Sequence, residues 1–358
     1  MNLLIDARPL VGSRTGIGVH TAEIARRLAI APPPILASHA SIENRVGIEH
    51  CRFRVDESAL GVVWQQLKLP RIAAEERADV VWGPHGTLPL TLRAPAVVTL
   101  HDFTSITMPG RHRLKTILSF NLFIGPSLER AARIAAVSRT TADEAMRSFG
   151  LAASRITIVP NGVDEVFRPT DSPADRGSLP EDLRDTPYLL FVGTIEPRKG
   201  IDDLLDVWES LPRPRPRLVL CGDRGWKSEP LLARARKLPD VTIAGFAGSL
   251  LLLALYQNAL AFVYPSRHEG FGIPPLEAMA CGAPVVATRT GAIPEFASDA
   301  ALLIAPGDTN ALRVAIVRIL GDPALRAELG ARGAERARLY RWDRSAAIMS
   351  DLLAAAAR

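Results

Sequence analysis

Cysteine and long apolar runs are scarce in this chain. The three cysteines, Cys51, Cys221 and Cys281, lie far apart and without the spacing of a metal site. We expect them to be reduced core thiols of a cytoplasmic protein, which excludes a disulfide scaffold. The most apolar window, residues 249–264, contains two side-chain amides and is too short to span a bilayer. It predicts a buried helix followed by a strand, and no transmembrane segment is expected.

A large excess of one charge is also missing. The chain carries 43 basic and 38 acidic residues, so its net charge is only +5. This slight excess suits an anionic substrate or an anionic membrane surface, but it is too dispersed to indicate nucleic acid. Asp6 stands where a signal peptide would need apolar residues, so no signal peptide is expected to begin here.

What the chain does contain is an alternation of strands and helices in two sets. Its 358 residues predict about two domains, and its 47% hydrophobic and 23% charged content is typical of globular proteins. The first set of expected strands covers residues 3–5, 35–36, 80–82, 96–100, 133–137 and 156–159. The second set covers residues 188–192, 218–220, 241–244, 261–264, 284–287 and 301–304.

The economical architecture is an α/β fold of two doubly wound domains with a cleft between them. We place the N-terminal domain at residues 1–168 and the C-terminal domain at 188–339. The polar, proline-rich stretch 169–187 between them is expected to be a linker. Residues 340–358 are expected to be a helix that crosses back to the first domain, with Trp342 as a large apolar anchor.

The chain is organised around residues 261–287, which predict a strand, a glycine-rich loop, a helix and a second strand. Pro274 and Pro275 suit the first turn of that helix, where a missing N–H costs nothing. The loop therefore lies at the amino end of a helix, where free backbone N–H groups and the helix dipole favour an anion. Glu269 and Glu277 flank this loop, and carboxylates beside an anion site are suited to accept hydrogen bonds from sugar or ribose hydroxyls.

A second cationic element follows the expected strand 188–192. A glycine turn at Gly193 leads to Arg198 and Lys199 at a helix start, where a guanidinium fork and a point charge together suit a diphosphate. Basic residues near turns are common, so this pattern is weak alone. Combined with the loop between Glu269 and Glu277 in the same half, it predicts a site for a nucleotide diphosphate-sugar.

Two features of the first half are open to a functional and a structural interpretation. His101 follows the expected strand 96–100, at the edge where open α/β sheets bind ligands, and a functional role is favoured. The glycine loop 12–18 could be a dinucleotide fingerprint, but Thr21 replaces its third glycine and Ser38-His39 replaces its acid. A redox cofactor is therefore disfavoured. A turn closing on another domain's ligand and a purely structural turn remain about equally favoured.

Residues 111–133 begin with a basic cluster and continue with interleaved apolar residues. The basic residues are Arg111, His112, Arg113 and Lys115. Such a segment could rest on an anionic membrane, although a domain helix with a solvated edge is slightly preferred. Pro126 is expected to interrupt any long helix here.

These motifs resemble those of the retaining GT-B glycosyltransferases of family 4. The Glu269–Glu277 spacing matches the family's E-x7-E motif, Val-Pro-Asn-Gly-Val-Asp stands at 159–164, and Ala-Val-Ser stands at 136–138. The resemblance covers nearly the whole chain, is very specific over 159–307 and is looser over 31–95. It implies two Rossmann-like domains in the GT-B arrangement, with a nucleotide-sugar donor in the C-terminal domain and an acceptor in the N-terminal one.

The resemblance also implies roles for particular residues. Glu277 would hold the ribose hydroxyls, and Glu269 would hold a hydroxyl of the donor sugar. Arg198 and Lys199 would bind the diphosphate, and His101 would touch the donor sugar. The remaining residues would act through the backbone: Gly270, Phe271, Gly272 and Leu276 by offering N–H groups, and Gly16 and Gly18 by closing over the phosphates. Family members use neither a cofactor nor a catalytic metal, and no Asp-x-Asp stands here in a plausible site.

The chain departs from the common family pattern at Thr194, where many members carry arginine. The Glu-Pro-Arg-Lys form at 196–199 is similar to a mannosyltransferase-rich subgroup, which favours GDP-mannose as donor and a saccharide or lipid-linked saccharide as acceptor. The apolar run 250–253 is a second departure, because relatives usually carry acids there. The protein is then expected in the cytoplasm, with peripheral contact at the inner face of the cell membrane left open.

Three alternative functions remain open. One is a UDP-sugar-dependent glucosyl or N-acetylglucosaminyl transferase. Another is an epimerase or phosphorylase of the same architecture, which the Glu269–Glu277 block matches less well. The third is a catalytically silent subunit that only binds a nucleotide sugar or a glycan, against which the intact set of charged residues argues.

Overall fold

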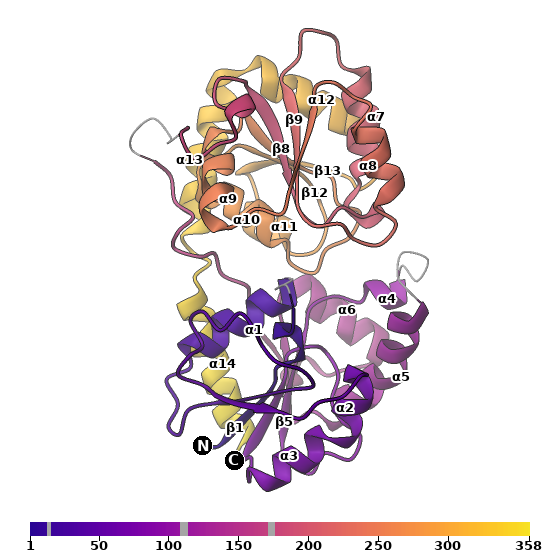
Figure 1. Cartoon of the computed structure of the whole chain (residues 1–358), viewed down its shortest axis with the longest axis vertical. Helices are drawn as coiled ribbons and strands as arrows, with labels where there is room; N and C mark the ends of the chain where they lie inside the picture. The colour runs from indigo at the N-terminus through magenta and orange to yellow at the C-terminus, as the bar shows by residue number, and fades with distance from the viewer. Residues whose placement is uncertain (13–15, 108–113, 171–175) are drawn as a thin grey trace. The chain divides into compact units, whose positions relative to one another are not determined.

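The computed structural model describes residues 1–12, 16–107, 114–170 and 176–358, which form two compact units (Figure 1). Unit 1 comprises Met1–Gly162 and Arg341–Arg358, and unit 2 comprises Val163–Tyr340. The chain therefore changes unit after Gly162, earlier than the predicted boundary at residue 168. In each unit, helices flank a parallel sheet, which confirms the predicted doubly wound α/β class.

Unit 1 contains a seven-stranded sheet in the order β3-β2-β1-β4-β5-β6-β7. Its strands are β1 (Leu3–Asp6), β2 (Ile35–Ser38), β3 (Arg52–Val55), β4 (Val80–Gly83), β5 (Ala96–Leu100), β6 (Arg133–Ala136) and β7 (Ile156–Ile158). The central strands β1, β4 and β5 are buried along their whole length, because helices cover both faces of a parallel sheet. The edge strand β3 was not predicted, since its two arginines break the apolar run that marks the other strands.

The helices of unit 1 cover the two faces of this sheet. They are η1 (Arg8–Leu10), α1 (Gly16–Arg27), α2 (Gly61–Leu67), α3 (Leu69–Glu75), α4 (Thr104–Thr107), α5 (Leu114–Arg130), α6 (Arg139–Phe149), η3 (Ala153–Arg155) and α14 (Trp342–Ala356). Side chains of α2, α3 and α5, including Trp64, Ile72 and Leu128, form one continuous core with the strands. Helices α1 and α14 pack against each other, and α14 packs against β4, β5 and β6 (Figure 1).

The C-terminal helix belongs to unit 1 because its first residue packs against the end of that unit. Trp342 is 2% exposed, which is the predicted anchoring role. A Cβ added to Gly162 would lie 2.3 Å from the backbone nitrogen of Trp342, so only glycine permits this approach. The Ser345 hydroxyl donates to the Pro160 carbonyl at 2.5 Å and fastens the same junction.

Unit 2 contains a six-stranded sheet in the order β10-β9-β8-β11-β12-β13. Its strands are β8 (Tyr188–Val192), β9 (Arg217–Cys221), β10 (Val241–Gly245), β11 (Ala261–Tyr264), β12 (Val285–Thr288) and β13 (Ala301–Ile304). Its helices are η4 (Glu181–Leu183), η5 (Pro197–Lys199), α7 (Ile201–Ser210), α8 (Glu229–Ala235), α9 (Ser249–Asn258), α10 (Ile273–Ala280), α11 (Ile293–Ala297), α12 (Thr309–Gly321) and α13 (Pro323–Ala337). Strand order reverses between β8 and β11, and such a switch point is where open α/β sheets bind ligands.

Four local predictions differ from the structure. Gly16 and Gly18 lie in the first turn of α1 rather than in a loop, and Pro126 lies inside α5 without ending it. Ile124 and Leu128 on either side of that proline are buried, so tertiary packing outweighs the lost hydrogen bond. Helix α9 is only partly buried, since Leu250 is 73% exposed.

The fourth difference concerns the described parts of the predicted linker, residues 169–170 and 176–187, which group with unit 2. Leu179 and Leu183 in this stretch are buried, which ties it to the unit despite its polar composition. The three cysteines are free and buried, as predicted. Over the described ranges, no helix has both the length and the apolar character needed to cross a membrane.

Candidate active site

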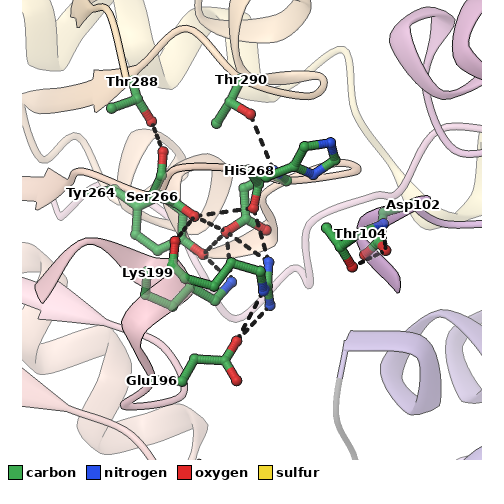
Figure 2. A network of polar contacts seen from close by, with 11 residues as sticks. Asp102, Thr104, Glu196, Lys199, Tyr264, Ser266, His268, Thr288 and Thr290 are labelled. Atoms are coloured by element: carbon green, nitrogen blue, oxygen red, sulfur yellow. Dashed lines mark hydrogen bonds and ion pairs between the residues drawn. The ribbon is translucent and has the colours of Figure 1, made fainter. Parts of the chain in front are cut away.

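The candidate site of unit 2 lies at the switch point of its sheet. Strand β8 leads into Thr194 and then η5, and the neighbouring strand β11 leads into the glycine loop before α10. Because the two strands are parallel, both connections leave the same edge of the sheet. The cationic element with Lys199 and the loop with Glu269, which were predicted separately, are thereby brought together (Figure 2).

Glu269 is the centre of this cluster. It is 8% exposed, and its Oε1 accepts hydrogen bonds from Lys199 Nζ at 2.6 Å, Tyr264 Oη at 2.9 Å and Ser266 Oγ at 2.6 Å. Burial opposes its charge, but Lys199 and Arg198 outweigh that effect and hold the pKa of this carboxyl below its ordinary value. Glu269 is therefore a carboxylate at neutral pH.

Lys199 is buried with its ammonium bound on two sides. It is 8% exposed and also donates to Tyr264 Oη at 2.8 Å, so its orientation is fixed before any ligand arrives. Burial and the neighbouring Arg198 lower the pKa of Lys199, while Glu269 acts in the opposite direction. Gly200 makes the close packing possible, because it has φ +68° and an added Cβ would lie 2.1 Å from the Pro265 carbonyl oxygen.

Arg198 points to a different set of partners. Its Nε and Nη2 donate to Glu196 Oε1 at 3.1 and 2.7 Å, and its Nη1 donates to the His268 carbonyl at 2.9 Å. Its Nη1 lies 3.7 Å from Glu269 Oε1. The guanidinium is thus positioned at the cluster by backbone and carboxylate groups. Thr194, which stands where many family members carry arginine, is exposed just after β8.

The glycine loop and α10 are built as predicted, with two prolines in the first turn of the helix. Gly272 has φ +93° and precedes the helix. Phe271 and Leu276 are buried, and the Phe271 ring packs against Phe296 at 5.5 Å between centroids. Their side chains are therefore core, which leaves only their backbone groups for the predicted binding role.

Glu277 lies in an environment opposite to that of Glu269. Burial raises the pKa of Glu277 to about 7, although Tyr256 Oη donates to its Oε2 at 2.9 Å, and the Asp164 carboxylate raises it further. One carboxylate of the motif is thus ionised by adjacent cations, whereas the other titrates near neutral pH.

The remaining predicted residues, His101, Gly16 and Gly18, belong to unit 1 and are described there. His101 Nε2 lies 2.8 Å from the Pro84 carbonyl oxygen, which can only accept, so Nε2 carries the proton and Nδ1 is an acceptor. Burial lowers the pKa of His101 to about 4, so the ring is neutral at pH 7. Gly16 is exposed and Gly18 buried in the first turn of α1.

Sequence reasoning missed three hydroxyl side chains of the site: Tyr264, Ser266 and Tyr256. The first two flank the turn between β11 and Glu269, and polar residues at the end of a buried strand were the available signal. Tyr256 gave no signal, because it stands in the apolar run of α9. In the ranges that the structure covers, no group of three or more His, Cys, Asp and Glu side chains could hold a metal ion.

The family models agree with this two-part architecture. Residues 14–167 match the model described as Glycosyltransferase Family 4, and residues 175–336 match the model described as Glycosyl transferases group 1. The O-antigen chain mannosyltransferase B of Escherichia coli is 32% identical over 96% of this chain and 97% of the relative. The chain therefore belongs to glycosyltransferase family 4, and it is a hexosyltransferase.

Solved structures place the fold in the GT-B class. Sucrose-phosphate synthase from Thermosynechococcus elongatus has a TM-score of 0.79 and 25% identity, covering 98% of this chain and 97% of that one. The Anabaena protein HepE in complex with UDP-glucose has a TM-score of 0.82 and 21% identity, covering 99% and 100%. The predicted family and fold are confirmed.

Proposed function

We propose that this enzyme transfers mannose from GDP-mannose to a saccharide or lipid-linked saccharide, with retention of configuration and without a metal. The observation that carries the proposal is the cluster at the β8/β11 switch, where Lys199 and Arg198 converge on Glu269. The donor sugar is suggested by the Escherichia coli relative, whose name is that of a mannosyltransferase. The same relative acts on an O-antigen chain by name, which supports a glycan acceptor.

In the proposed mechanism, departure of the nucleoside diphosphate is the difficult step. Negative charge grows on the leaving phosphate oxygen, and the Arg198 guanidinium, the Lys199 ammonium and the amino end of α10 stabilise that charge. Glu269 Oε2 accepts from a hydroxyl of the donor sugar, and Glu277 accepts from the ribose hydroxyls. Retention follows if the acceptor hydroxyl attacks from the face that the leaving group vacates, with its proton passing to the departing phosphate.

A contact between neutral His101 of unit 1 and the donor sugar is proposed from the family resemblance alone. The Nδ1 lone pair of His101 can accept a hydrogen bond from a sugar hydroxyl, because the Pro84 carbonyl holds the proton on Nε2. Roles for Gly16 and Gly18 toward the phosphates are likewise proposed from the family resemblance alone.

A panel of nucleotide sugars tests the donor. GDP-mannose is expected to raise the thermal midpoint more than UDP-glucose, UDP-N-acetylglucosamine or UDP-galactose at equal concentration, because a ligand that binds only the folded state stabilises it. The second candidate, a UDP-sugar transferase, is favoured by the structural likeness to HepE with bound UDP-glucose, and a larger shift with a UDP sugar would establish it. A shift without hydrolysis or transfer would indicate the silent binding subunit.

Transfer is expected to survive chelation. Excess EDTA should leave the initial rate within about twofold, since side-chain cations and a helix terminus supply the charge that a metal would otherwise supply. The rate is measured with and without EDTA on the donor that the panel selects. Complete loss that Mg²⁺ or Mn²⁺ restores would contradict the proposal.

Contact with an anionic membrane is proposed for the segment 111–124. Arg111, His112 and Arg113 lie outside the described residues, but α5 presents Leu122, which is 67% exposed. Liposome flotation is expected to show binding that requires anionic lipid, weakens with salt and is reduced in Leu122→Asp. If the wild-type protein does not bind anionic liposomes at low ionic strength, this surface is only a solvated helix edge.

A further inference from the structure

Tyr256 is a buried residue of α9 whose hydroxyl donates to Glu277. We propose that Tyr256 is a positioning residue for Glu277: its hydroxyl fixes one carboxylate oxygen and favours the ionised form, which leaves the other oxygen free to accept from the ribose of the nucleotide. This inference rests on the proposed function, in which Glu277 binds ribose hydroxyls.

The geometry leaves the Tyr256 side chain little freedom. Its ring is 0% exposed and meets the edges of Phe167 and Phe262, with centroids 5.8 and 5.6 Å away. Its hydroxyl donates to Glu277 Oε2 at 2.9 Å. An aromatic ring held on two sides places its oxygen at one point, so the carboxylate is fixed through a rigid support.

A phenylalanine would fill the same space without a buried polar group. A buried hydroxyl is costly unless it is hydrogen-bonded, and here Glu277 is the group that satisfies it. Tyr188 offers a contrast in the same unit, because its buried hydroxyl donates to the Leu255 backbone carbonyl at 2.8 Å. That bond stabilises the fold, whereas the bond from Tyr256 is made to a residue of the site.

The charges around Glu277 show what the hydroxyl does. Asp164 faces the carboxylate and opposes its ionisation, and the Cys281 thiol lies close enough for Glu277 to raise the pKa of that thiol. Helix α13 approaches Gly282 through Gly330 and Met279 through Gly333, so it adds no charge through these contacts. The Tyr256 hydroxyl is thus the group that favours the carboxylate against burial and Asp164.

The sign of the pH effect follows. A hydroxyl that donates to a carboxylate stabilises the charged form, so its removal raises the pKa of Glu277 above the value of about 7 that it has with Tyr256 present. A carboxyl that remains protonated at neutral pH loses acceptor capacity toward ribose. Binding of the nucleotide should then require a higher pH.

The experiment compares Tyr256→Phe with wild type by calorimetry between pH 6 and pH 9, using GDP and UDP as probes. At pH 7 we expect about a fivefold loss of affinity in Tyr256→Phe, because a pKa of Glu277 that is higher by about one pH unit lowers the ionised fraction by that factor. At pH 9 most of the affinity should be recovered, because the carboxyl is then ionised in both proteins. In a Glu277→Gln background, the same substitution should produce no pH-dependent difference.

Tyr188→Phe is the matched control. It removes an equally buried hydroxyl of unit 2. Its affinity at each pH therefore reports the effect of lost stability and of phosphate protonation on nucleotide binding, without a change at Glu277. A Tyr256→Phe loss that is equal at all pH values, or that persists in the Glu277→Gln background, would overturn the proposal and leave Tyr256 a packing residue. Unchanged affinity in Glu277→Ala would instead overturn the ribose assignment on which the proposal rests. If neither GDP nor UDP binds wild type, both fail.

Discussion

An Arg198→Ala variant is expected to lose about 10²–10³ in kcat, while its affinity for the donor nucleotide falls much less. The charge that Arg198 is proposed to stabilise grows on the leaving oxygen only as the transition state is approached. The guanidinium is held in place by Glu196 and the His268 carbonyl, so its orientation is prepared in advance. Steady-state kinetics with the selected donor and calorimetry with the nucleoside diphosphate separate the two effects.

Two further variants sharpen this result. Arg198→Lys should recover only part of the activity, because a planar fork is replaced by a point charge. Thr194→Arg combined with Arg198→Ala should recover activity if an arginine on the exposed end of β8 reaches the same phosphate. Such a recovery would show that the common family arrangement and the present one are equivalent.

The matched control for this series is Arg267→Ala. Arg267 lies on the loop after β11, where its guanidinium pairs with Asp202 and Asp203 of α7 and donates to the Pro197 carbonyl, so it supports the same loop without pairing with Glu269. It should lower stability without the selective loss of kcat. Turnover close to wild type in Arg198→Ala would mean that Arg198 only stabilises its loop and that Lys199 is the side chain that binds the diphosphate.

The second large effect is expected on folding stability. Glu269→Ala should lower the free energy of unfolding by about 3–5 kcal/mol, because it leaves the buried Lys199 ammonium without its carboxylate. Lys199→Met should be damaging for the converse reason, although Tyr264 and Ser266 still donate to Glu269. Urea denaturation followed by fluorescence measures both.

The double variant Lys199→Met/Glu269→Gln separates stability from catalysis. With neither charge present, no unpaired charge is buried, so most of the lost stability should return. Transfer should stay reduced by about 10² or more, because both the cation and the anion of the site are gone. Activity that returned along with stability would show that the pair serves the fold alone.

Glu328→Ala is the control for the stability measurement. Its partner Arg332 lies one turn along α13, and both side chains are about half exposed. Breaking this pair should change the free energy of unfolding by less than about 1 kcal/mol. Single variants of Lys199 and Glu269 that cost no more than this control would refute the assignment of a buried ion pair.

The elements that sequence patterns predicted well are those with a local cause. Strands β8, β11 and β13 occupy the predicted residues because each lies in a short apolar run, with no more than two residues between the strand and the nearest polar residue, Gly or Pro. Helix α10 begins where its two prolines predicted, since proline is tolerated in a first turn. Strand β3 and the continuation of α5 through Pro126 were missed, because an edge position and core packing respectively overrode the local signal.

By itself, the sequence determined the class of fold, the family and most of the charged residues of the candidate site. These follow from local periodicity and from fixed spacings such as that between Glu269 and Glu277, which are properties of neighbouring residues. Tertiary structure alone decided which groups meet: Lys199 reaches Glu269 across 70 residues, and Tyr256 reaches Glu277 from another helix. It also decided that one carboxyl has a lowered pKa and the other a raised one. Burial and the distance to a counter-charge set an ionisation state, and both exist only after strands and helices from distant parts of the chain have packed.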